Sequence, residues 1–157
     1  FTGIMTTPGF DTAGLSGPYP EYVKAMRESF LLTLQGKPYE SSEVVNLALI
    51  GPIFLKLESE NLKKILKSMA EHGNNPNSGH MAAVGSSPNR FEKLKEVSIP
   101  TLIIHGTEDP LIPVDHGEAI ANQIKNSEKL IIEGMGHNFP TLLIPAIIEE
   151  MVNHFEE

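Results

Sequence analysis

Two residues of this sequence, Asp109 and His137, have the types and the spacing that general acid–base chemistry requires. Asp109 follows the apolar run Thr101 to His105 and is itself followed by a proline. His137 closes the glycine-flanked run Gly134-Met135-Gly136-His137, which follows the next apolar run of the chain. Imidazole takes up and releases protons near neutral pH, and a buried carboxylate can fix its tautomer and orientation. The pair therefore predicts a histidine base that is oriented by an aspartate.

Each of these residues also has an ordinary structural explanation when it is considered alone. An aspartate before a proline often forms a turn, and a single histidine is more often structural than catalytic. Their equivalent positions after successive strands favour the catalytic interpretation. Asp115 and Glu118 instead have the spacing of a capping box, so we interpret them as helix-capping residues. The histidines that we interpret as solvated or capping residues are His72, His116 and His154.

Two strand-and-helix units are predicted to carry the acid and the histidine. The strands are expected at Thr101–His105 and Lys129–Ile132, and the helices at about Asp115–Ile124 and Leu142–Phe155. Such alternation favours parallel strands that are joined by a right-handed crossover. Because the loops after parallel strands open into one crevice, we expect Asp109 and His137 to lie close together.

The part of the chain before these units is predicted to be a strand end followed by a layer of helices. Apolar residues at helical spacing predict helices from Pro20 to about Gly36, from Ser41 or Ser42 to Gly51-Pro52, and from Ser59 to about His72. A turn-rich segment follows, and then a short helix is expected at His80–Val84 and a helical turn around Phe91–Val97.

Composition and charge exclude several classes of function. The 157 residues are 40% hydrophobic and have a net charge of -8 without a basic block, so we expect one globular domain and no nucleic-acid partner. Cysteine is absent and no His, Asp or Glu trio has metal-ligand spacing, so we expect no disulfide, no metal and no cofactor. No apolar run is long enough to span a membrane and no segment has signal-peptide character, so we expect a cytoplasmic protein without a membrane partner.

Three short motifs surround the two candidate residues. They are His105-Gly106-x-x-Asp109-Pro110-Leu111-Ile112-Pro113, His116-Gly117 and Gly134-Met135-Gly136-His137. Together they resemble the C-terminal third of the α/β-hydrolases, and most of all the aclacinomycin methylesterase-like hydrolases. The resemblance implies that Asp109 is the acid and His137 the base of a hydrolytic triad.

The same resemblance implies an α/β fold class, with a helical cap followed by the strand-helix-strand-helix end of a parallel sheet. Residues 1–10 would be the end of a core strand and a turn, 11–95 the helical cap or lid, and 96–157 the C-terminal part of the hydrolase core. His80 and Met81 in the cap and Leu111 beside the acid would face a small-molecule ester substrate, although ordinary packing is the alternative for His80 and Met81.

The nucleophile of such a triad has no counterpart in the sequence. In this family it lies on a G-x-S-x-G elbow between a strand and a helix. Neither Ser16 nor Ser86-Ser87 has that pattern, so we interpret them as loop serines. We therefore expect the chain to be the C-terminal fragment of a serine carboxylic ester hydrolase, inactive alone, whose exposed sheet edges favour a homo-oligomer or a strand-swapped association.

Two other functions remain open at this point. The chain could be a non-catalytic binding or interaction module on a hydrolase-like scaffold, engaging a partner through the region Val44–Leu57. It could also support another α/β-hydrolase chemistry, since dehalogenases, epoxide hydrolases and carbon–carbon hydrolases resemble it in the same acid and histidine.

Overall fold

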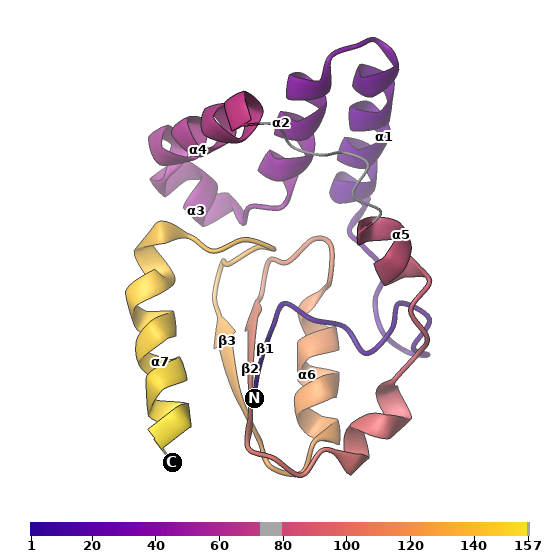
Figure 1. The fold of residues 1–157 in the computed structure, drawn as a ribbon, viewed down its shortest axis with the longest axis vertical. Coiled ribbons are helices and arrows are strands. Elements are labelled where there is room, and N and C mark those ends of the chain that lie inside the picture. Colours follow the sequence, from indigo (N-terminus) through magenta and orange to yellow (C-terminus); the bar gives the residue numbers. More distant parts are fainter. Residues whose placement is uncertain (73–79, 157) are drawn as a thin grey trace.

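A parallel sheet of three strands, with a helix on each face, forms the core in the part of the chain that the structure describes (Figure 1). The computed structural model describes residues 1–72 and 80–156, without the side chains of 59, 69–72 and 80–82. The elements of this core are β1 (Thr2–Ile4), β2 (Thr101–Gly106), α6 (Val114–Gln123), β3 (Ser127–Ile132) and α7 (Ile144–Glu156). Both pairings in the order β1-β2-β3 are parallel, which confirms the predicted fold class.

The central strand β2 is buried along its whole length because helices cover both faces of the sheet. Leu102 and Ile104 pack in one cluster with Ile147 of α7. Ile103, which lies between them, packs with Ile120 of α6 in a second cluster. This alternation is the two-residue period of a strand. A strand that is buried at every position is typical of a parallel sheet with both faces covered.

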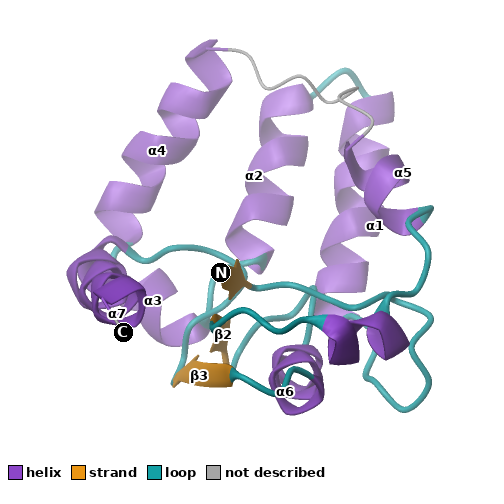
Figure 2. Cartoon of the chain, turned by 60° about the horizontal axis from the view of Figure 1, so that its bottom comes forward, coloured by secondary structure: helices purple, strands orange, loops and turns teal. Residues whose placement is uncertain are grey.

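A layer of helices lies beyond the carboxyl ends of the strands (Figures 1 and 2). Its elements are α1 (Pro20–Leu34), α2 (Pro38–Ala48), α3 (Pro52–Leu57) and α4 (Ser59–His72), after which α5 (His80–Gly85) and the 3-10 helix η1 (Phe91–Glu96) lead back to β2. The layer contacts the sheet loops directly, since the Tyr19 N–H before α1 donates to the Pro110 carbonyl at 2.8 Å.

The second helix begins earlier than its serines predict. The first residue of α2 is Pro38, and neither Ser41 nor Ser42 is its N-cap. Ser41 is instead buried inside the helix, where its hydroxyl donates to the Ser29 carbonyl of α1 at 2.9 Å. A contact between two helices has therefore replaced the capping role that the residue type favours.

The capping prediction for Asp115 and Glu118 is also wrong. Pro113 occupies the N-cap position of α6, and no side chain caps this helix. The Asp115 carboxylate accepts a hydrogen bond from the Ser16 N–H at 2.8 Å. Since this bond joins the loop before α1 to the start of α6, the carboxylate serves tertiary structure.

Two histidines predicted to be solvated or capping residues are buried. His116 is 1% exposed, and its ring contacts the Thr7 hydroxyl through Nδ1 and the Ser16 carbonyl through Nε2, at 2.9 and 2.8 Å. His154 is 8% exposed and lies 3.5 Å from Glu128 of β3. The side chain of His72 lies outside the described residues. Both buried rings join elements that are distant in sequence.

Among the helices of the described residues, none is long and apolar enough to cross a membrane.

Candidate active site

The first component of the site is the loop after β2, residues 107–113, called here the acid loop. Asp109 in this loop is fully buried. Its Oδ1 accepts hydrogen bonds from the backbone N–H groups of Leu111 and Ile112, at 3.0 and 2.8 Å. A carboxylate that binds the amides just after it forms a tight local turn, and Pro110 removes backbone freedom from the same turn. The Asp109 side chain is therefore rigidly placed, with Oδ2 left for another donor.

The second component is the loop after β3, residues 133–140, called here the histidine loop. It runs alongside the acid loop, because the Thr107 and Glu108 N–H groups donate to the Ile132 and Met135 carbonyls, each at 3.0 Å. Gly106 makes this approach possible, since a Cβ at that position would lie 2.0 Å from the Met135 oxygen. Glycine at the end of β2 is thus required for the two loops to meet.

The two loops bring Asp109 and His137 into direct contact. His137 Nδ1–H donates to Asp109 Oδ2 at 2.7 Å, a short charge-assisted distance. The imidazole is 23% exposed whereas the carboxylate is completely covered. Because Nδ1 carries the proton shared with Asp109, Nε2 is the basic nitrogen of the neutral ring. The arrangement can therefore accept a proton from a group outside the pair.

Asp109 stays ionised in spite of its burial. Burial alone would raise the pKa of Asp109, but hydrogen bonds from His105 and His137, the charge of His137 and the Ile112 amide outweigh it. The pKa of this carboxyl is consequently held below its ordinary value of 3.8. At neutral pH the pair thus contains a carboxylate that can stabilise a positive charge on the imidazole.

His105 is also part of the site. In the sequence it stood out only as the first residue of the motif that contains Asp109, without a predicted role. It is fully buried in β2, and its Nε2–H donates to the Ile112 carbonyl at 2.8 Å while lying 3.5 Å from Asp109 Oδ2. The ring thereby supports both the acid and the loop that holds it. A histidine in an otherwise apolar buried strand, shortly before the acid, is the signal that could have identified this role.

The other candidate residues lie as follows. Leu111 is partly buried in the acid loop and contributes its N–H to Asp109. The side chains of His80 and Met81 lie outside the described residues, although their backbone begins α5. The hydroxyls of Ser86 and Ser87 donate to the Ala83 carbonyl, so these serines stabilise the end of α5.

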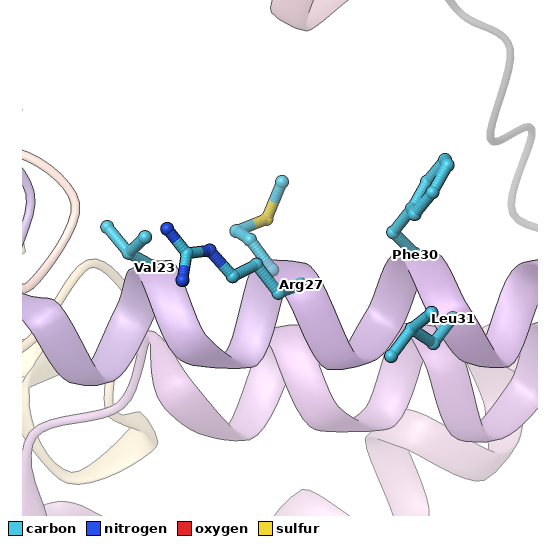
Figure 3. A pocket seen from close by; sticks show the side chains of 5 residues that line it. Val23, Arg27, Phe30 and Leu31 are labelled. Carbon is cyan, nitrogen blue, oxygen red and sulfur yellow. The ribbon is translucent and has the colours of Figure 1, made fainter.

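Two further features bear on ligands. Among the side chains that the structure describes, no group of three or more His, Cys, Asp or Glu is suited to a metal ion. An open hollow of about 440 Å³ lies on α1 and is lined by Val23, Met26, Arg27, Phe30 and Leu31 (Figure 3). It contains neither residue of the histidine–aspartate pair.

Comparison with known proteins gives consistent matches. A family model described as TAP-like protein, of the α/β-hydrolases, matches residues 68–155. Over 49 residues the chain is 44% identical to the human Alpha/beta hydrolase domain-containing protein 17B, a match that covers 31% of this chain and 17% of that protein. The chain is also 46% identical over 49 residues to the Alpha/beta hydrolase domain-containing protein 17C of Xenopus tropicalis, a match that covers 16% of that protein.

Solved structures match over nearly the whole chain. An α/β hydrolase enzyme from a Medee basin deep-sea metagenome library has a TM-score of 0.74 at 15% identity, covering 99% of this chain and 55% of that one. The enol-lactonase of Burkholderia xenovorans has a TM-score of 0.73 at 13% identity, with the same coverage of 99% and 55%. At these identities the likeness concerns the fold, and the chain spans about half the length of these solved proteins.

Proposed function

This chain belongs to the α/β-hydrolase family, within the group described as TAP-like proteins, and we propose that it supplies the acid and the base of a serine carboxylic ester hydrolase. The observation that carries the proposal is the 2.7 Å contact between His137 Nδ1 and Asp109 Oδ2, in loops that follow neighbouring parallel strands. Catalytic groups of open parallel sheets lie in this position.

The proposed reaction needs a nucleophile from outside these 157 residues, because they contain no G-x-S-x-G elbow. A serine hydroxyl attacks the ester carbonyl carbon while His137 Nε2 takes the hydroxyl proton. The same proton then passes to the leaving alcohol as the carbon–oxygen bond breaks. Water repeats the sequence on the acyl-serine and releases the acid. Asp109 holds the imidazole and stabilises its transient positive charge.

We further propose that the helices within residues 11–95 form a cap over this site and that the substrate is of the kind handled by aclacinomycin methylesterase-like hydrolases. The contact between Tyr19 and Pro110 supports the cap, since it places the start of α1 on the acid loop. Tyr22 of α1 supports it too, because burial first and then the negative charge of Asp109 raise the pKa of its hydroxyl. His80, Met81 and Leu111 are the proposed substrate contacts.

A fluorophosphonate probe reacts covalently with activated serines. It tests the proposal that this chain supplies the acid and the base while an upstream segment supplies the nucleophilic serine. The isolated chain should take up no probe and hydrolyse no p-nitrophenyl ester, because it lacks the nucleophile. The longer polypeptide that joins this chain to an upstream elbow should be labelled at the elbow serine and should hydrolyse the ester. Labelling of the isolated chain, or an unlabelled longer polypeptide, would contradict the proposal.

A second candidate is an interaction module. The apolar side chains that favour it line the hollow on α1, outside the region Val44–Leu57 that the sequence indicated. Phe30 is 63% exposed and Leu31 56% exposed, and larger apolar surfaces of this kind often contact other proteins. This candidate predicts that the isolated chain self-associates and that Phe30→Glu restores a monomer. Sedimentation velocity over a range of concentrations measures both. A monomer at every concentration, with or without the substitution, would eliminate self-association through α1.

A further inference from the structure

The histidine loop is held by a segment of the helical layer, residues 49–58, which we call the clamp. The first contact is at His137 itself, whose backbone N–H donates to the Leu49 carbonyl at 2.7 Å. Next to it two glycines allow the backbones to touch. A Cβ at Gly51 would lie 1.9 Å from the Gly134 oxygen, and one at Gly136 would lie 2.2 Å from the Leu49 oxygen. No other residue type fits at either position without moving a loop.

The second contact of the clamp is Glu58, at the end of α3. Its carboxylate is buried, with the residue only 7% exposed. Oε2 accepts the Thr141 N–H at 3.0 Å and Oε1 accepts the Leu142 N–H at 2.7 Å. These amides belong to the 3-10 helix η2 (Thr141–Leu143), which directly precedes α7. Glu58 therefore satisfies N–H groups that the helix start leaves without intrahelical partners.

The burial of Glu58 makes this contact specific. Within the described residues no ion pair includes Glu58, and its carboxylate accepts hydrogen bonds from the Thr141 and Leu142 N–H groups. Asn61 adds a third link three residues later, since its Nδ2 donates to the Thr141 hydroxyl at 2.8 Å. The clamp thus fixes the histidine loop at His137 and again where the loop enters η2.

We infer that Glu58 is a positioning residue for His137, acting through Thr141 and Leu142. Its catalytic consequence rests on the proposed function, whereas its effect on the position of His137 does not. A loop fixed at one end only would let the imidazole move relative to Asp109, whose own position is set by the acid loop. Small displacements of a catalytic group lower rates strongly. If this inference is correct, the clamp in the helical layer also fixes the position of the His137 imidazole.

Glu58→Gln and Glu58→Ala test the inference, with Glu60→Gln as the matched control. Gln keeps one acceptor oxygen but presents an NH₂ group to the second amide, and Ala removes both acceptors. Glu60 follows two positions later, and its side chain is 80% exposed in a surface pair with Lys63. The three variants therefore separate loss of the two bonds from loss of a negative charge at this end of α4.

The first readout is nuclear magnetic resonance of the isolated chain. The downfield Nδ1–H proton of His137 reports the bond to Asp109, and amide exchange reports the loop. We expect Glu58→Gln to broaden the proton signal and to speed exchange of the His137 and Leu142 amides about 10- to 100-fold, with a larger effect for Ala and none for Glu60→Gln. If only Thr141 and Leu142 exchange faster while the His137 signals are unchanged, Glu58 is a helix cap and the inference is wrong. Should the Ala variant not fold, the Gln variant decides by the same criterion.

The second readout is ester turnover by the longer polypeptide. Glu58→Gln should lower kcat about 10-fold or more without a matching change in KM, whereas Glu60→Gln should leave both unchanged. An unchanged kcat in Glu58→Gln would overturn the catalytic consequence. If the polypeptide with Glu58 intact shows no turnover at all, the proposed hydrolase activity has failed, and the resonance experiment still decides whether Glu58 positions His137.

Discussion

Replacing His137 with alanine is expected to lower kcat of the longer polypeptide toward a p-nitrophenyl ester by a factor on the order of 10⁶. In the proposed mechanism the imidazole removes the proton from the nucleophile, because its Nδ1–H is bound to Asp109 and its Nε2 is therefore basic. Without it the serine hydroxyl stays protonated at neutral pH. KM should change little, since the imidazole stabilises the transition state and contributes little to binding of the substrate.

Two controls make this result specific. His154 of α7 packs beside Glu128 of β3 and belongs to neither site loop, so His154→Gln should leave turnover per folded molecule near the unsubstituted level. Added imidazole should restore part of the activity of His137→Ala, because the substitution leaves a space of the same shape. Retention of more than about a hundredth of kcat by His137→Ala would exclude the base role, since removal of a triad histidine costs several orders of magnitude more.

The sequence predicted the elements of the site well because local patterns determine them. The apolar run of β2 and the alternation of strand and helix require parallel neighbours, and parallel neighbours place the loops of Asp109 and His137 side by side. The sequence did not indicate which residues the glycines of the site approach. The structure identifies what each glycine approaches: Met135 for Gly106 and Leu49 for Gly136.

The residues that sequence patterns misplaced are those whose partners are distant along the chain. Ser41 has the type of a helix cap, but a carbonyl of the neighbouring helix takes its hydroxyl. His116 has the type of a solvated residue, but its ring bonds to Thr7, 109 positions earlier. Glu58 carried no signal at all, because a glutamate between two helices usually faces solvent. Burial of this kind follows from tertiary packing and has no local period.

Asp109→Asn should lower kcat of the longer polypeptide by about 10⁴. The amide has the shape of the carboxylate and can still accept the Leu111 and Ile112 N–H bonds through its oxygen. Its NH₂ group, however, takes the position of Oδ2. In the unsubstituted protein Oδ2 accepts the hydrogen bond from His137 Nδ1–H. Two donors cannot pair, so the imidazole either turns or moves its proton to Nε2, and in both cases the basic nitrogen no longer meets the nucleophile. Asp115→Asn is the control, because the Asp115 carboxylate binds the Ser16 N–H and does not contact His137. This variant should keep turnover near the unsubstituted level.

The same substitution should change the acid dependence of stability. Because the folded pKa of Asp109 is lower than the ordinary value of 3.8, ionised Asp109 stabilises the fold above that value, and the contribution is lost as the pH falls through the folded pKa. At neutral pH, Asp109→Asn should lower the free energy of unfolding by about 1–3 kcal/mol, the usual cost of leaving buried donors unpaired. Urea unfolding of both forms between about pH 7 and pH 3 should show this difference shrinking below the ordinary value of 3.8. A difference of constant size across that range would mean that the carboxylate is not held ionised by the two histidines, and the electrostatic basis of the pair would have to be abandoned.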